Sequence, residues 1–369
     1  MEKPVLSSFE IHGFRAFEHL KLEKLGKVNL FTGKNNVGKS SLLEALWVYA
    51  SQGSPSVLLS ILEGRDESEP VSGNYLMELD IKTLMMSVSS LFFGRVGFSA
   101  DRTSPKLQIG SSKNPLRIKF LWVTENLNEN SPRATREAIT LDDLADAVPG
   151  LQIEYGENVK ITSFIRFFRR STQNSSTKFE RNCVFVPAGG FSKAEISRYW
   201  DTTTLGPLEN SVLDALRILE PEIERINLVG STKSTNFRDR TPIVKLRSFE
   251  SPVPLRSLGE GMNRMFGLAL ALVNAQDGFL LVDEVESGLH YSVLPEMWSF
   301  IFQVARKLNV QVFATTHSWD CITGFQQTAV ENDQDGMLIR LVNKKGKIVP
   351  TFFDEKDLAI ATREQIEVR

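Results

Sequence analysis

The residues with the clearest chemical potential lie in a short loop near the N-terminus. Residues 33–40 read GKNNVGKS and fit the pattern GxxxxGK[ST] without a mismatch. Glycines let such a backbone curl so that its N–H groups face a phosphate, and a helix that starts at the loop adds partial positive charge. The pattern assigns Lys39 to the β- and γ-phosphates and Ser40 to Mg²⁺. The candidate nucleotide contacts are Gly33, Asn35, Asn36, Val37, Gly38, Lys39, Ser40 and Ser41.

A second candidate group stands at the end of an apolar segment. Residues 279–284 read FLLVDE, which indicates a buried strand that ends in two carboxylates. Asp283 at the strand end is expected to bind magnesium beside Ser40, and Glu284 is placed to act as general base on the attacking water. A strand that simply runs into an acidic turn is the alternative, and the phosphate loop disfavours it. Together the two groups predict hydrolysis of a bound nucleotide with Mg²⁺.

The elements that must position these residues can be read from hydrophobic spacing. An apolar strand at 28–31 enters the loop, and apolar residues at helical spacing follow at 40–49. Further predicted helices are 141–148, 208–219, 259–274, 292–307 and one at the C-terminus. Further predicted strands are 116–120, 159–168, 183–187, 279–282 and 310–314, with a hairpin around 343–347. Residues 51–180 otherwise read as loops around short strands.

Composition excludes several classes of protein. The 369 residues include 43 Lys and Arg against 45 Asp and Glu, and 41% are hydrophobic. These values are unlike a disordered chain or a protein that coats DNA without specificity. Two separated cysteines do not make a disulfide scaffold, and no apolar run is long enough to span a bilayer, so we expect a cytoplasmic protein. The four histidines, at 12, 19, 290 and 317, are dispersed and lack metal-ligand spacing.

Two more segments complete a recognisable order. Residues 257–261 read SLGEG and residues 315–318 read TTHS. The succession of phosphate loop, SLGEG, acidic strand end and TTHS resembles that of the ABC-type ATPases. FRAF at 14–17, NNVGKSSLLEAL at 35–46 and EVESGLH at 284–290 are similar to stretches of their RecF/SMC/OLD-like branch. The resemblance implies an α/β fold, a P-loop ABC-type ATPase head with a mixed central sheet flanked by helices, an antiparallel β-subdomain and a helical signature lobe.

The resemblance also implies roles for single residues. Ser257, Gly259 and Glu260 look like the signature motif that binds the γ-phosphate of a nucleotide held by another subunit. The sequence departs from LSGGQ here, so the register of Glu260 is open. His317 looks like the switch histidine that supports Glu284. Arg15 either touches the phosphates or supports the loop, and the choice stays open.

Partners and organisation follow from the same resemblance. One chain cannot press its phosphate loop and its signature onto one ATP, which implies a head-to-tail dimer or a higher even oligomer. Glu286 and Ser287 match the D-loop and would cross that interface, whereas neither Gln108 nor Gln152 can be chosen as the Q-loop glutamine. We expect a single head over residues 1–369, with a Walker A lobe at 1–50 and a β-subdomain plus insertion at 51–256. Residues 257–320 hold the signature, Walker B, D-loop and switch histidine, and 321–369 form a C-terminal hairpin and helix.

The expected function is regulatory. Only about fifty residues follow His317, too few for the Toprim nuclease domain of OLD proteins. The chain therefore resembles stand-alone ATPase subunits of bacterial anti-phage systems, such as the AriA-like component of PARIS, which work with a separately encoded effector protein. The alternative is a RecF-like DNA-repair ATPase that binds DNA directly. A basic, aromatic run at 165–170 is compatible with nucleic acid and equally with a solvated strand face.

Overall fold

The computed structural model describes most of the chain: residues 5–68, 81–96, 105–111, 113–126, 135–138, 147–164, 166–167, 182–204, 207–230, 240–331 and 336–353. Across these residues, no helix has both the length and the apolar character that a membrane crossing requires. Both cysteines, Cys183 and Cys321, carry free thiols.

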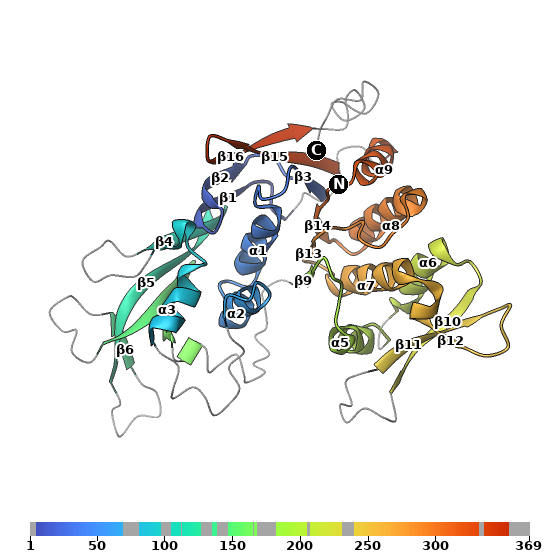
Figure 1. Ribbon diagram of the computed structural model, residues 1–369, viewed down its shortest axis with the longest axis horizontal. Helices are drawn as coiled ribbons and strands as arrows, with labels where there is room; N and C mark the ends of the chain where they lie inside the picture. The colour runs from blue at the N-terminus through green and yellow to red at the C-terminus, as the bar shows by residue number, and fades with distance from the viewer. Residues whose placement is uncertain are drawn as a thin grey trace.

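A six-stranded sheet runs through the molecule and carries the phosphate loop at the end of one strand (Figure 1). Its order is β16-β15-β3-β14-β13-β9, and every neighbouring pair is parallel except β15 with β16. β3, β13 and β14 are buried along their whole length, as expected of parallel strands covered on both faces. The strands are β3 (Val28–Thr32), β9 (Cys183–Val186), β13 (Phe279–Val282), β14 (Gln311–Thr315), β15 (Gly336–Lys344) and β16 (Lys347–Phe353).

Helices cover the two faces of this sheet. α1 (Lys39–Ala50) contacts β9, β13 and β14 on one face, while α7 (Glu260–Asn274), α8 (Leu294–Lys307) and α9 (Trp319–Glu331) lie on the other (Figure 1). Side chains alternate between the faces of a strand. In β13, Phe279 and Leu281 join the apolar core on the α1 side, and Leu280 and Val282 join the core that includes α7 and α8. The sheet thus separates two cores and fixes α1 against β13.

An antiparallel sheet packs beside α1 and includes the N-terminal hairpin. Its order is β2-β1-β4-β5-β7-β8, with β6 paired to β5. Its buried face shares one core with α1 and the helix that follows it. β2 also contacts β16, so the two sheets meet at that edge. The elements are β1 (Phe9–Phe14), β2 (Phe17–Leu22), α2 (Pro55–Glu63), α3 (Ile81–Ser89), a 3₁₀ turn (Phe93–Arg95), β4 (Lys106–Ser111), β5 (Asn114–Asn126), β6 (Thr135–Ala138), β7 (Val148–Tyr155) and β8 (Asn158–Ser163).

A third group of elements packs on α7. A small antiparallel sheet, β10-β11-β12, leads into a 3₁₀ turn at the start of that helix. The two preceding helices contact α7 directly. The elements are α5 (Lys193–Thr204), α6 (Glu209–Leu219), β10 (Ile223–Gly230), β11 (Arg240–Leu246), β12 (Val253–Pro254) and the 3₁₀ turn Leu255–Leu258. The predicted α/β fold, with a mixed central sheet, an antiparallel β-subdomain and a helical lobe, is confirmed.

Several predicted elements differ from the structure in detail. The strand predicted at 159–168 ends at Ser163, because the chain is helical at Phe164 and at 166–167. α2 and α3 lie where only loops and short strands were predicted; Pro55 occupies the first helical position of α2, where its missing N–H costs nothing. Residues 141–146 and the predicted C-terminal helix lie outside the described residues, and Val148 is part of β7. The predicted division of the chain stays a prediction, and β9 from the 51–256 segment lies in the central sheet.

Candidate nucleotide-binding and hydrolysis site

The loop between β3 and α1 has the conformation that its glycines permit. Gly33 and Gly38 have φ of 139° and 86°, which residues with a Cβ rarely adopt. A Cβ at Gly33 would collide with the carbonyl oxygen of Leu341, and one at Gly38 would lie 2.8 Å from the Phe17 ring. No side chain caps the N-terminus of α1, so its backbone N–H groups remain available to an anion.

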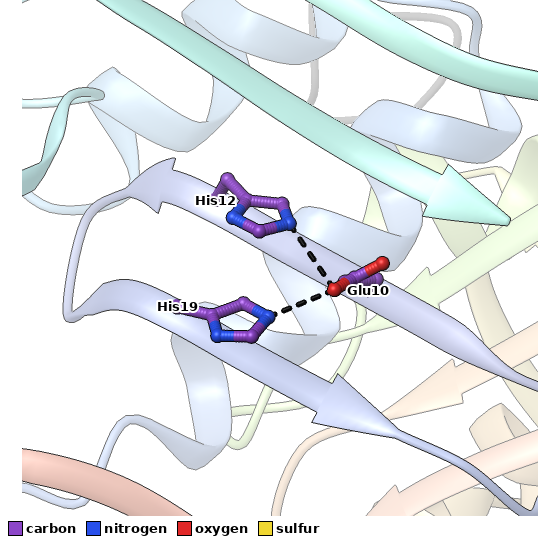
Figure 2. A group of neighbouring side chains, drawn as sticks. All are labelled: Glu10, His12 and His19. Atoms are coloured by element: carbon purple, nitrogen blue, oxygen red, sulfur yellow. Dashed lines mark hydrogen bonds and ion pairs between the residues drawn. The ribbon is translucent and has the colours of Figure 1, made fainter. Parts of the chain in front are cut away.

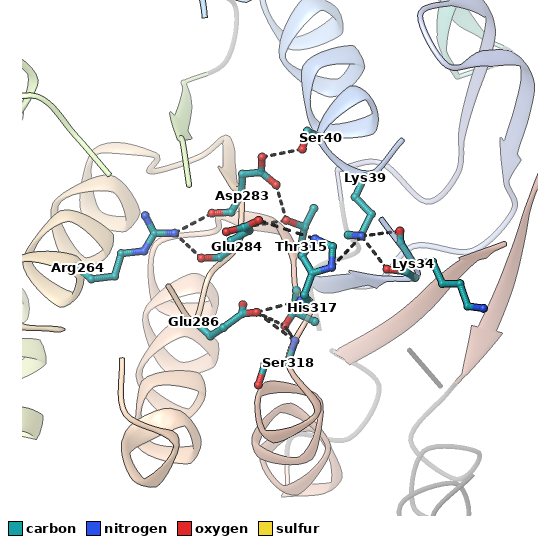
Figure 3. Close-up of polar contacts among 12 residues, drawn as sticks. Lys34, Lys39, Ser40, Arg264, Asp283, Glu284, Glu286, Thr315, His317 and Ser318 are labelled. Carbon is teal, nitrogen blue, oxygen red and sulfur yellow. Dashed lines mark hydrogen bonds and ion pairs between the residues drawn. The ribbon is translucent and has the colours of Figure 1, made fainter. Parts of the chain in front are cut away.

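Lys39 lies under the loop and is buried. Its Nζ donates to the carbonyl oxygens of Gly33 at 2.7 Å and Lys34 at 3.1 Å (Figure 3). Burial lowers the pKa of Lys39, and nearby Asp283 and Glu284 oppose that shift. The ammonium is therefore held at the mouth of the loop by neutral acceptors, where a phosphate would be a stronger partner.

Asp283 joins the acidic strand end to the start of α1. Its Oδ2 accepts from Ser40 Oγ at 2.8 Å, and its Oδ1 accepts from Thr315 Oγ1 at 2.6 Å (Figure 3). Hydroxyl and carboxylate oxygens are the ligands that Mg²⁺ prefers, usually alongside water and phosphate oxygens. The donor set at Ser40 and Asp283 therefore fits a magnesium ion.

Glu284 and His317 face each other across the cleft. Glu284 has φ of 48°, its side chain is 45% exposed, and its Oε1 lies 3.8 Å from His317 Nε2. His317 Nδ1 lies 3.4 Å from Lys39 Nζ. An ammonium can only donate, so Nδ1 is the acceptor and the imidazole proton sits on Nε2, toward Glu284. His317 therefore lies between Lys39 and Glu284 and contacts both.

Arg264 holds the turn that carries both acids, and sequence reasoning missed it. The side chain reaches from α7 and is buried; its NH2 group donates to the carbonyl oxygens of Asp283 at 2.8 Å and Glu284 at 2.7 Å (Figure 3). Its NH1 group donates to Pro187 at 3.0 Å, just after β9. Burial lowers the pKa of this guanidinium. Arg264 thus fixes the left-handed backbone of Glu284 from behind.

Glu286 braces the segment after β14. Its Oε1 accepts from Thr316 Oγ1 at 2.8 Å, from the N–H of His317 at 3.0 Å and from the N–H of Ser318 at 3.2 Å. These contacts lie within its own chain, and the predicted place of this carboxylate at a subunit interface stays a prediction. Glu286 thus orients the backbone of His317, whereas Arg264 orients the backbone of Glu284.

Arg15 is enclosed by carboxylates. Its side chain is 5% exposed; Nε lies 3.0 Å from Glu44 Oε2 and NH2 lies 2.9 Å from Glu67 Oε2. Glu44 comes from α1, so the pair ties the turn between β1 and β2 to the helix behind the phosphate loop. Burial raises the pKa of Glu44, and Arg15 and Arg65 act against that rise. Of the two roles left open for Arg15, these contacts favour support of the loop.

One cleft brings most of the predicted site residues together. It is lined by Arg15, Asn35, Asn36, Gly38, Lys39, Ser40, Ser41, Glu284 and His317. Val37 is buried beneath the loop. Of the glutamines considered for the Q-loop, Gln108 and Gln152 lie on β4 and β7, and neither lines this cleft.

The predicted signature residues stand elsewhere in the structure. Ser257 lies in the 3₁₀ turn, Gly259 has φ of 109° and precedes α7, and Glu260 is exposed and pairs with Arg256 at 2.8 Å. None of the three lines the cleft beside Lys39; Glu260 lines a different hollow, together with Ser287 and Gly288. No side chain caps the N-terminus of α7.

Two protein-family models match this chain over the segments that build the site. Residues 5–84 match a family described as "AAA ATPase domain", and residues 208–320 match one described as "AAA domain, putative AbiEii toxin, Type IV TA system". The first match contains the phosphate loop and the second contains Asp283 and Glu284. The chain is a P-loop ATPase. Its predicted enzymatic activity, hydrolysis of ATP, is confirmed.

The ATPase has curated relatives over most of its length and over shorter stretches. It is 23% identical over 363 residues to a Helicobacter pylori protein named "ATP/GTP phosphatase", covering 89% of this chain and 90% of that one. It is 33% identical over 82 residues to the uncharacterised Methanocaldococcus jannaschii protein MJECL11, covering 22% of this chain and 72% of that one. The ATPase belongs to the same protein family as MJECL11.

Solved structures of SMC heads also align with the ATPase. A head bound to the C-winged helix domain of ScpA is 13% identical, with 95% of this chain and 98% of that one covered and a TM-score of 0.48. The Thermotoga maritima SMC head domain is also 13% identical, with 95% and 99% covered and a TM-score of 0.43.

Proposed function

We propose that the ATPase assembles head to tail on ATP and, through that assembly, regulates a separate effector protein in bacterial anti-phage defence. The observation that carries the proposal is the separation of two nucleotide half-sites. The cleft at Lys39 holds the phosphate loop and the hydrolytic acid, while Gly259 and Glu260 stand outside it. A second copy is needed to bring the signature residues of one chain to the nucleotide of another.

Within one cleft, each residue has a distinct task in hydrolysis. Lys39 and the backbone N–H groups of the loop bind the phosphates. Ser40 and Asp283 would hold magnesium, which neutralises phosphate charge when bound. Glu284 orients and deprotonates the attacking water, because it is an exposed carboxylate at the cleft. The Nε2–H group of His317 can donate a hydrogen bond to Glu284 or to the γ-phosphate. Its partner therefore changes when hydrolysis removes the γ-phosphate.

The start of α7 supplies the opposite half-site. Gly259 adopts a positive φ, and among the described residues no atom outside its chain neighbours lies within 4 Å of where a Cβ would stand. An open, uncapped helix N-terminus is suited to the γ-phosphate of a nucleotide on another subunit. The arrangement makes two shared nucleotides in a closed dimer, and each intact site that binds ATP stabilises the assembly.

The effector part of the proposal is supported by the description of one matching family. That description gives the matching domain itself as a putative toxin of a type IV toxin–antitoxin system, a setting in which it works with a second protein. An ATPase whose assembly state changes with hydrolysis can switch the activity of a partner protein on or off as ATP is consumed. The test takes as candidate effector a protein encoded by an adjacent gene. Its activity is measured in the presence of the parent ATPase or of Glu284→Gln, each with and without ATP. An effector indifferent to both would refute it.

The shared site is tested by mixing two inactive variants. Lys39→Ala removes the phosphate contact of one half-site, and Gly259→Asp places a negative charge in the other. Each variant alone should be inactive, whereas an equal mixture should recover about a quarter of the parent rate, because half of the dimers are mixed and each keeps one intact site. Gly259→Ala is the matched control for backbone strain without charge. A mixture as inactive as its components, with both variants folded, would refute the shared site.

Direct DNA binding is the second candidate, and one surface favours it. Lys106, Arg117 and Lys119 are exposed on one face of the neighbouring strands β4 and β5, where Lys106 lies opposite Lys119 in the strand register. Phosphate contacts make DNA affinity fall steeply with salt. ATP-dependent binding to duplex DNA with such a salt dependence, lost in Arg117→Gln with Lys119→Gln, would support this candidate. DNA affinity that does not change with salt concentration, or that the two substitutions leave unchanged, would argue against DNA binding at this surface.

A further inference from the structure

Three metal-ligating side chains gather on the N-terminal hairpin, away from the nucleotide cleft. Glu10 and His12 lie on β1 and His19 on β2, and one ligand atom from each lies within 4.8 Å of the others (Figure 2). The prediction that the histidines lack metal-ligand spacing is therefore wrong for this pair. Sequence separation does not show the spacing, because the hairpin folds the two histidines onto each other.

Strand register creates the cluster. His12 and His19 are directly opposite in the antiparallel pair, and Glu10 is two residues before His12, so all three side chains share one face. The two imidazole rings stack with centroids 4.3 Å apart. Glu10 Oε1 lies 3.2 Å from His12 Nε2 and 2.8 Å from His19 Nε2. Both imidazoles thus turn their Nε2 atoms toward one carboxylate oxygen.

We infer that Glu10, His12 and His19 form a three-ligand site for a divalent transition-metal ion of the Zn²⁺ type. Two imidazole nitrogens and one carboxylate oxygen are a donor set that zinc accepts, with a fourth position for water. Bond lengths of about 2.0–2.2 Å place neighbouring ligand atoms of a tetrahedral site roughly 3.3 Å apart, near the distances seen here. The hard, oxygen-preferring ions Mg²⁺ and Ca²⁺ do not match two imidazoles.

Charge and exposure are compatible with ion entry. The hydrogen bond from His19 lowers the pKa of Glu10, so without a metal this carboxylate is the anionic partner of the two imidazoles. The side chains of His12 and His19 are 44% and 52% exposed. An ion can therefore reach the three atoms from solvent, and a water molecule can complete its coordination.

The site has a defined place relative to the nucleotide cleft. β1 and β2 are joined by the turn that contains Arg15 and Ala16, and both of these residues line the cleft. The ion would join the two strands behind that turn. None of the three ligands lines the cleft itself, so the metal site stands whether or not the proposed dimer mechanism is correct.

The test is a direct measurement of zinc binding by the chain without a polyhistidine tag. Zn²⁺ alone is the probe, titrated against a chromophoric chelator in the absence of nucleotide. One equivalent should bind tightly, and His12→Gln, His19→Gln or Glu10→Gln should each weaken it by at least the roughly 10- to 100-fold that loss of an outer-shell partner costs. The controls are His290→Gln, which removes another exposed histidine, and Asp283→Asn, which removes a carboxylate of the nucleotide cleft.

The inference is overturned if the parent chain binds no zinc, or if all three ligand variants leave zinc binding unchanged, whatever the effect of Asp283→Asn. X-ray absorption of the zinc-loaded parent gives a readout that does not depend on variants folding. Two imidazole nitrogens in the coordination shell support the site, and a shell of oxygens only refutes it. Binding should also weaken on acidification, because imidazole ligates only when neutral.

Discussion

Replacing Arg15 by methionine separates support of the phosphate loop from contact with phosphate. The guanidinium lies between Glu44, 9% exposed, and Glu67, 11% exposed. Removing one partner of a buried ion pair costs about 3–5 kcal/mol, because a buried charge is left uncompensated. Here each carboxylate keeps a second cation on its other oxygen, Arg65 at 2.6 Å and Arg95 at 2.7 Å. We therefore expect the lower end of that range, about 3 kcal/mol of unfolding free energy.

The assay is urea unfolding of the parent and of Arg15→Met, with nucleotide affinity measured well below the transition. Arg95→Met is the matched control, since Arg95 pairs with the same Glu67 but is exposed, and exposed pairs contribute about 0–1 kcal/mol. The expected pattern is a large loss of stability for Arg15→Met, a small one for Arg95→Met, and nucleotide affinity retained in both. Unchanged stability together with lost nucleotide binding would refute the support role and assign Arg15 to the phosphates.

The same variant should show a defined dependence on pH. Burial already raises the pKa of Glu44 above its ordinary value of 4.5, and Arg15 is the largest opposing influence. Without Arg15 that pKa rises further in the folded state. A carboxyl whose folded pKa is raised favours folding below its unfolded pKa and loses that contribution as pH rises through the folded pKa. The stability deficit of Arg15→Met should therefore shrink as the pH is lowered from neutral, and a deficit that grows would contradict this account.

Three further changes act on the cleft. Glu284→Gln should lower kcat by about 10²- to 10⁴-fold with nucleotide binding retained, because it removes the base but not the phosphate contacts; an unchanged rate in a phosphate-release assay would reject that role. Lys39→Ala should abolish binding of a fluorescent ATP analogue, and retained affinity would contradict its placement at the phosphates. Arg264→Lys, which cannot reach three carbonyl oxygens from one planar group, should lower kcat more than it raises KM; the opposite split would show that Arg264 does not position Glu284.

The parts of the site that the sequence predicted are those encoded in contiguous residues. The phosphate loop and the acidic strand end are short, and each follows its own apolar strand, so hydrophobic patterning placed both. Arg264 could not be found this way. Its partners are the backbone carbonyls of four residues, which carry no signal in residue type: Pro187, Ala188, Asp283 and Glu284. Their proximity depends on the parallel pairing of β9 with β13, which only the fold reveals.

The hairpin cluster was missed for a similar reason. Two-residue hairpin turns are usually signalled by Asn-Gly or Gly-containing pairs, because their backbone needs positive φ. Here the turn uses Arg15 with φ of 48° followed by Ala16, which gives no such signal. Without the turn the register of β1 and β2 was unknown, and a shift of one residue would send His12 and His19 to opposite faces. The helices α2 and α3 were hidden by the Ser-, Gly- and Pro-containing segments around them.

The position of β3 within its sheet has a consequence for biosynthesis. Val28 pairs with Val312 on one side and with Gly336 on the other, so the strand that presents the phosphate loop receives both neighbours from the far end of the chain. A nascent chain emerging from the ribosome carries the motif early but cannot enclose it until β14 and β15 have been translated. Until then the apolar face of α1 cannot pack against the central sheet and stays exposed, and exposed apolar surfaces promote aggregation. Competence to hold ATP is therefore among the last properties the polypeptide acquires, and a product cut short before β15 would contain the motif without the site.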